Sequence, residues 1–214
     1  MKNPLMGKSR LEAFSDGVFA IAITLLILEV KIPKQEDIHA LGGLYKYLMH
    51  IWPSYIAYFV TFFMIGIYWS NHHHLFAHII KKTDHYFNLI NIWFLLGIAF
   101  MPFSTAVFSD YILDPESRNA AVTIYCIGLF LTQPPLILFI IYGKKRKGIF
   151  DPNLDPEFLN KQFVKMIIAT TITMFSIAMS FYYPMISLTI TGATWLMYFL
   201  PPDVPVFNTM NNKD

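Results

Sequence analysis

The sequence has little charge and a single cysteine, and both shortages narrow the class of protein. Only 14% of its 214 residues are charged and 55% are hydrophobic, whereas soluble domains are about 25% charged. The charged residues cluster between long apolar runs, a pattern typical of an integral membrane protein. Cys126 is alone and cannot form an intrachain disulfide. We therefore expect a membrane protein without an internal disulfide.

Two further absences exclude other readings of the chain. The net charge is only +2, and there is neither a basic stripe nor zinc-finger spacing, so nucleic acid is not an expected partner. No small-residue cleavage site follows the first apolar run, so we expect that run to be retained as a membrane span and not removed as a signal peptide.

Six apolar segments predict six membrane-spanning helices. They cover residues 13–31, 48–70, 86–108, 119–142, 163–183 and 185–200. Most approach the ~20 residues that a helix needs to cross ~30 Å of hydrocarbon, and the sixth is the shortest. No alternating barrel strands are visible. The sequence therefore predicts an all-α integral membrane protein with one domain, residues 1–200, and a short cytoplasmic tail, residues 201–214.

The distribution of lysine and arginine predicts the orientation in the membrane. Twelve of the sixteen lie on the side of the N-terminus: Lys2, Lys8, Arg10, Lys81, Lys82, Lys144, Lys145, Arg146, Lys147, Lys161, Lys165 and Lys213. The other side holds Lys31, Lys34, Lys46 and Arg118. Because positive residues concentrate in cytoplasmic loops, both termini are predicted to be cytoplasmic. The KKRK cluster at 144–147 is interpreted as a topology anchor attracted to anionic membrane lipid.

The first span, RLEAFSDGVFAIAITLLILEV, has polar residues at its start. Arg10, Ser15 and Asp16 precede twelve uncharged residues, 17–28. A carboxylate at the mouth of a hydrocarbon span is costly, which indicates a functional or structural partner. Ser15 or Asp16 is a candidate helix N-cap, and Arg10 is a candidate partner of Asp16 or of another helix. Such a network would fix the tilt and rotation of the helix.

One face of the same helix is apolar. Ile21, Leu25 and Leu28 share it at the 3.6-residue period, and Thr24 lies beside them. Contact with lipid or with another helix is the ordinary explanation of such a face. The polar residues at the start of the span, Arg10, Ser15 and Asp16, favour instead a helix that lines a pore or cavity.

Three stretches of the sequence together resemble one known family. The first is Arg10-x-x-x-Phe14-Ser15-Asp16, followed by an uncharged run that contains Thr24. The second is Trp69-Ser-Asn-His-His-His, and the third runs from residue 88 to residue 104 and includes Met101-Pro102-Phe103-Ser104. They are similar to segments of the transmembrane protein 175 family, the potassium channels of lysosomes and endosomes. Animal members carry two six-helix units, whereas this chain carries one, like the bacterial members, which assemble as tetramers.

The resemblance implies a potassium-permeable channel in a bacterial plasma membrane, not an enzyme, with the first helix of each chain around the central pore of a homotetramer. It places a hydrophobic constriction at Ile21, further pore-lining layers at Thr24, Leu25 and Leu28, and potassium selectivity at Thr24. It also implies a helix-locking motif of Arg10, Phe14, Ser15 and Asp16, for which Trp69, His73 and Asn91 are a candidate supporting network. The TVGYG filter of ordinary potassium channels is absent, and the transported ion K⁺ is the only small ligand implied.

A histidine cluster leaves two alternative functions open. His74 and His78 could share a helical face and bind zinc, but HExxH is absent and only one histidine box is present. We favour histidines that hydrogen-bond neighbouring helices, and predict no metal and no cofactor. The alternatives are a proton- or cation-coupled secondary transporter and, with less support, a histidine-metal membrane enzyme. A transporter needs a charged residue near mid-membrane, whereas Asp16 and Glu29 lie near the ends of the first span.

Overall fold

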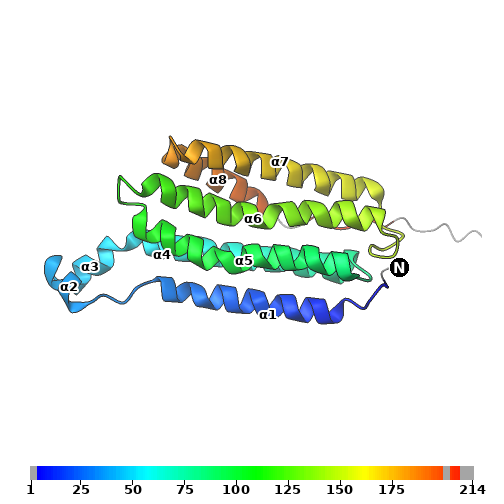
Figure 1. Cartoon of the computed structure of the whole chain (residues 1–214), viewed down its shortest axis with the longest axis horizontal. Helices are drawn as coiled ribbons and strands as arrows, with labels where there is room; N and C mark the ends of the chain where they lie inside the picture. Colours follow the sequence, from blue (N-terminus) through cyan, green and yellow to red (C-terminus); the bar gives the residue numbers. More distant parts are fainter. Residues whose placement is uncertain (1–3, 200–202, 208–214) are drawn as a thin grey trace, which may run out of the picture.

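The computed structural model describes residues 4–199 and 203–207, and its regular structure over this part of the chain is helical. The elements are α1 (Ser9–Leu25) with a 3₁₀ turn (Leu26–Glu29), α2 (Gln35–Ala40), α3 (Leu44–His50), α4 (Trp52–His74) with a π-helical turn (Leu75–Ile79), α5 (His85–Tyr111), α6 (Arg118–Lys145), α7 (Pro156–Ser180) and α8 (Pro184–Phe199). The long helices form a bundle, and α2 and α3 lie at one end of it (Figure 1). In this bundle α5 packs against α1, α4 and α6, and α6 packs against α7 and α8.

The long helices match the predicted spans, with the last span the exception. Four helical segments of the described chain are long and apolar enough to cross a membrane: Ser9–Glu29, His85–Tyr111, Arg118–Lys145 and Pro156–Ser180. A fifth is formed by Leu44–His50 and Trp52–Ile79, which are bent by 50° relative to each other. The all-helical membrane fold is thus confirmed. The 16 residues of α8 reach about 24 Å at ~1.5 Å per residue, less than the ~30 Å of hydrocarbon.

Three short backbone contacts gather both ends of the described chain at one end of the bundle. Isolated β-bridges join Met6 to Thr83, Ile80 to Phe150 and Leu154 to Phe207. The N-terminal segment, the α4–α5 loop, the α6–α7 loop and the segment after α8 therefore meet there. The predicted tail lies outside the described residues except for residues 203–207.

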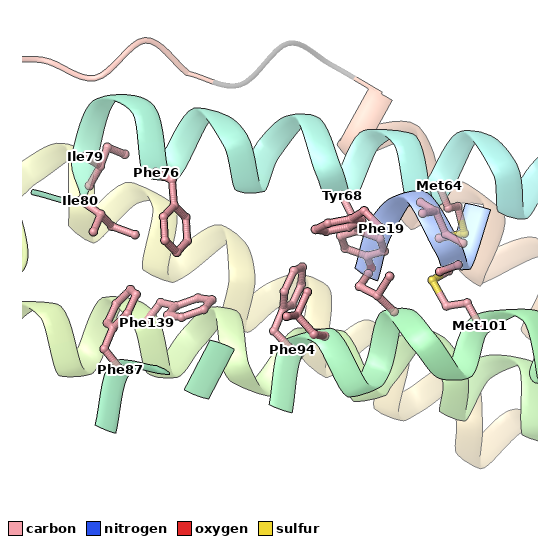
Figure 2. Close-up of a cluster of buried hydrophobic side chains, with 14 of the residues drawn as sticks. Phe19, Met64, Tyr68, Phe76, Ile79, Ile80, Phe87, Phe94, Met101 and Phe139 are labelled. Atoms are coloured by element: carbon pink, nitrogen blue, oxygen red, sulfur yellow. The ribbon is translucent and has the colours of Figure 1, made fainter. Parts of the chain in front are cut away.

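The core between α1, α4, α5 and α6 is rich in aromatic side chains. Figure 2 shows Phe76, Phe87 and Phe139 gathered at one end of this core and Phe19 and Phe94 farther along it. All five are at most 2% exposed. Each aromatic ring buries a large apolar area and prefers a defined geometry with its neighbours, so these contacts fix how the helices pack.

A buried carboxylate joins α5 to the end of α6. Asp84 caps α5 by accepting a hydrogen bond from the Phe87 backbone N–H (3.0 Å), and it also accepts from Tyr142 Oη (2.7 Å) and Arg146 Nε (3.2 Å). Although burial raises the pKa of Asp84, these hydrogen bonds hold it below its ordinary value. Arg146 belongs to the KKRK cluster, and through Asp84 it ties the end of α6 to the start of α5. The role of the cluster as a topology anchor remains a prediction.

Candidate functional site

Helix α1 has one covered face and one uncovered face. Its covered residues are Ser15, Phe19, Ala22 and, in the following 3₁₀ turn, Leu26, all at most 4% exposed. From Ala13 to the 3₁₀ turn, its uncovered residues, which we call the exposed stripe, are Ala13, Phe14, Gly17, Ala20, Ile21, Thr24, Leu25, Ile27 and Leu28. They recur every three or four residues, so they form one continuous line along the helix. The stripe contains every residue that the sequence predicts for the pore, and 61% of Ile21 is exposed.

The hydroxyl of Thr24 is oriented by its own helix. Thr24 Oγ1 donates to the backbone carbonyl of Ala20 (2.8 Å) and lies 3.0 Å from that of Ile21. Since the hydroxyl hydrogen is used within the helix, the oxygen keeps lone pairs that can accept a ligand. Thr24 is exposed, so these lone pairs are open to a ligand from outside the chain.

A chain of buried hydrogen bonds ties α1 to α5 and α4. The Ser15 hydroxyl donates to the Leu11 carbonyl (2.8 Å) and accepts from Asn91 Nδ2 (2.9 Å). Asn91 Oδ1 lies 2.9 Å from His72 Nε2. The amide nitrogen of Asn91 donates to Ser15, so its oxygen is the acceptor and His72 Nε2 carries the hydrogen. We refer to these three residues, one on each helix, as the Ser15–Asn91–His72 chain.

A second link joins α1 to α4 one residue farther along. Asp16 Oδ1 accepts a hydrogen bond from Trp69 Nε1 (2.9 Å). The Trp69 ring stacks on His73 with 5.8 Å between centroids, and His73 Nδ1 lies 3.6 Å from Glu12 Oε1. Together with the Ser15–Asn91–His72 chain, this link fixes the rotation of α1, so the exposed stripe is turned away from the other helices of the bundle.

Two expectations about the start of α1 are wrong. The helix begins at Ser9 with Lys8 as its N-cap, so Ser15 and Asp16 lie in its second turn and neither caps it. Asp16 pairs with Trp69 and not with Arg10, which is exposed and forms no hydrogen bond or ion pair with the residues that the structure describes. Phe14 lies on the exposed stripe. The helix-locking role of these residues remains a prediction.

Lys8 is an anchoring residue that the sequence did not indicate. Its ammonium group donates to the backbone carbonyls of Phe76 and Ile80 (2.9 Å to the latter) at the end of the π-helical turn. A lysine at the carbonyl end of a helix satisfies groups that have no partner within the helix. Nothing local in the sequence reports this contact, because 68 residues separate Lys8 from Phe76.

The histidine cluster is divided among different contacts. The rings of His74 and His78 lie 4.5 Å apart, and His78 Nδ1 is 3.2 Å from the His74 carbonyl. Over the described part of the chain, no group of three or more histidine, cysteine, aspartate or glutamate side chains is placed to hold a metal ion.

The chain is similar to known channel proteins over most of its length. Residues 10–102 match the family "Endosomal/lysosomal potassium channel TMEM175". A potassium channel of Chamaesiphon minutus is 45% identical over 122 residues, 57% of this chain and 58% of that protein. A potassium channel of a Chryseobacterium species is 32% identical over 199 residues, 92% of this chain and 94% of that protein. The endosomal/lysosomal proton channel TMEM175 of Homo sapiens is 34% identical over 133 residues, 60% of this chain and 26% of that protein.

The fold is similar to that of a solved channel structure. It is the crystal structure of a lysosomal potassium-selective channel TMEM175 homolog from Chamaesiphon minutus, with a TM-score of 0.80 and 29% sequence identity. The match covers 90% of this chain and 96% of that chain. The similarity therefore extends beyond the first three long helices to the whole bundle.

Proposed function

We propose, since the chain belongs to the TMEM175 family of endosomal/lysosomal potassium channels, that four copies of it form a potassium-permeable channel whose pore is lined by α1. The observation that carries this proposal is the exposed stripe. Two hydrogen-bonded links hold the opposite side of α1 against α4 and α5, and no residue that the structure describes covers the stripe. Copies arranged around an axis would bring their stripes together.

The chemistry of the stripe supports a narrow pore. Four Ile21 side chains around an axis would form a neck without polar ligands, and such a neck gates by losing its water. A cation that crosses the neck sheds part of its hydration shell, which is less costly for K⁺ than for Na⁺. The outward lone pairs of Thr24, one turn away, would replace part of that shell. Few oxygens are offered, so we expect modest selectivity.

The same proposal includes six membrane crossings with both termini cytoplasmic in a bacterial plasma membrane. Both ends of the described chain lie at one end of the bundle, which an even number of crossings requires. That end also carries most of the lysine and arginine residues, as cytoplasmic ends do. The short α8 would complete the sixth crossing by local thinning of the bilayer.

Ion flux from liposomes tests the pore assignment. Ile21→Asn should wet or widen the neck and raise the K⁺ flux, and Thr24→Ala should lower the preference for K⁺ over Na⁺. Ile168→Asn is the matched control, because Ile168 is exposed to 47% on α7, which packs on α6 and α8. Wild-type flux and selectivity in both α1 variants would overturn the assignment. A flux that saturates with K⁺ at carrier-like rates would favour a secondary transporter.

Proton permeation is a second candidate activity, favoured by the name of the human relative. Proteoliposomes with a trapped pH-sensitive dye would report H⁺ entry with K⁺ absent. If protons use the same pore, Ile21→Asn should raise both fluxes. An H⁺ flux that is independent of Ile21 would assign protons to another path or to none in this protein.

A further inference from the structure

An elongated cavity of about 310 Å³ lies between α4, α6 and α7. Its lining runs from Tyr68 to Ile79 along α4 and the π-helical turn, and from Phe158 to Ala169 along α7. At ~1.5 Å per residue, each of these walls is roughly 16 Å long. The volume lies within the range of about 300–1,000 Å³ for small-molecule pockets. Helix α1, which the structure describes in full, contributes no lining residue, so the cavity is a different site from the proposed pore.

The wall of the cavity is mainly apolar and rich in aromatic rings. Five of the lining residues are phenylalanine or tyrosine: Tyr68, Phe94, Phe139, Phe150 and Phe158. The apolar wall is completed by Leu75, Ile79, Leu136, Ile140, Leu159, Met166 and Ala169. An engineered apolar cavity of ~150 Å³ in another protein stays dry and binds benzene. The present cavity is about twice as large as that one, so it has room for two fused rings.

The rings around the cavity hold one another in place. The centroid of the Phe94 ring lies 6.1 Å from that of Tyr68 and 6.3 Å from that of Phe139, and both contacts are T-shaped. All three residues are buried. Rings that are fixed by their neighbours cannot easily move into the empty space, and an apolar cavity that does not collapse destabilises a fold in proportion to its volume. An apolar molecule that fills this cavity should therefore bind favourably.

The polar part of the lining favours an uncharged ligand. The charged side chains of the lining are Lys165 and Asp203, which are exposed and form an ion pair with each other. Gln162 Nε2 also donates to Asp203 (2.6 Å). Ala169, one turn beyond Lys165 on α7, is buried, so the charges lie at the mouth and the deeper wall is apolar. A charged ligand would leave water without a free partner in the cavity, which is costly.

We propose that this cavity is a binding site for a small uncharged aromatic hydrocarbon of about two fused rings. The flat ligand lies lengthwise between α4 and α7, against the rings of Phe139 and Phe158 and beside Met166 and Ala169. It makes no hydrogen bond, and its affinity comes from the apolar surface that it buries and from contacts with the aromatic wall. The site does not depend on the proposed pore.

Methionine methyl signals report the site without any change to the cavity. In protein labelled with ¹³C at its methionine methyl groups and held in nanodiscs of zwitterionic lipid, naphthalene should shift the signal of Met166, which lines the cavity. The shift should saturate at one naphthalene per chain. Met174 is exposed on the same helix and should respond only in proportion to the naphthalene dissolved in the lipid. A Met166 signal that merely follows that of Met174 would overturn the proposal.

A charged probe with the same two rings tests the preference for an uncharged ligand. 1-Naphthoate adds a carboxylate to naphthalene, and the paired Lys165 offers it no free cation. After subtraction of binding to empty nanodiscs, we expect naphthoate to bind at least tenfold more weakly than naphthalene. Equal binding of the two probes would contradict the proposal.

A cavity-filling variant gives an independent test. Ala169→Phe adds a ring to the lining of the cavity and should weaken naphthalene binding at least tenfold. Ala178→Phe makes the same change at an exposed position of α7 and should leave binding unchanged. Wild-type binding in folded Ala169→Phe protein would show that naphthalene binds elsewhere. The methionine signals of the wild-type protein decide the question even where Ala169→Phe does not fold.

Discussion

Removing the amide of Asn91 should destabilise the fold more than its size suggests. Asn91 is fully buried and makes hydrogen bonds of 2.9 Å to Ser15 and to His72. In Asn91→Ala, Ser15 still donates to the Leu11 carbonyl, but the His72 Nε2–H loses its acceptor. An unsatisfied buried donor costs about 1–3 kcal/mol, and the lost bond to Ser15 adds ~0.6 kcal/mol, the average for membrane helices. We expect a loss of about 2–4 kcal/mol in the free energy of unfolding.

The assay is reversible unfolding in mixed micelles, with Asn88→Ala as the control. Asn88 lies one turn earlier on α5, and its Oδ1 is buried without a partner, so its removal should cost less than about 0.5 kcal/mol. A double-mutant cycle with His72→Ala should give a coupling energy of ~1 kcal/mol. Equal losses for Asn91→Ala and Asn88→Ala, or additivity in the cycle, would refute the reasoning.

Two further predictions concern the packing of α5 and α6. The pKa of Asp84 is lowered in the folded protein. Its charged form therefore stabilises the fold above the unfolded pKa near ~3.9. This contribution is lost as the pH falls through the folded pKa. Asp84→Asn should therefore cost about 1.5–3 kcal/mol at pH 7 and nearly nothing below both pKa values; a difference from wild type that does not change with pH would contradict this. In Gly97→Ala the new Cβ would lie 2.8 Å from Thr132 Cγ2 and 2.9 Å from its backbone nitrogen, which should cost about 1–3 kcal/mol. Gly66→Ala has nothing within 4 Å, so thermal unfolding should show no loss, and an equal loss in both variants would argue against close α5–α6 packing.

The long helices could be predicted because bilayer thickness fixes their length. Hydropathy located α1, α4, α5, α6 and α7 to within a few residues at most ends. It missed α2 and α3, because their 6 and 7 residues form no apolar run of membrane length. It also located α8, whose 16 residues are fewer than the ~20 of a full crossing, so a sixth crossing remains a prediction.

The exposed stripe could be predicted from periodicity, and the residues that join α1 to its neighbours include Asn91 and Trp69, which the family resemblance named. Ile21, Leu25 and Leu28 follow the helical period, so their common face was visible in the sequence. Two contacts elsewhere in the bundle could not be predicted. The partners of Lys8 and Arg146 lie more than 60 residues away in the chain, and no local pattern indicates them. The N-cap prediction failed because the helix begins at Ser9. Ser15 is therefore inside the helix, where its hydroxyl donates to the Leu11 carbonyl.

The most direct test of the pore is the accessibility of position 21 to a thiol reagent during conduction. The native Cys126 is buried, so Ile21→Cys introduces the reactive thiol, and Ile168→Cys is its control on α7. A cationic methanethiosulfonate should block K⁺ flux through reconstituted Ile21→Cys, and high K⁺ should slow the reaction. Ile168→Cys should conduct as before. Flux through Ile21→Cys that persists after complete modification would show that the stripe of α1 lies outside the conduction path.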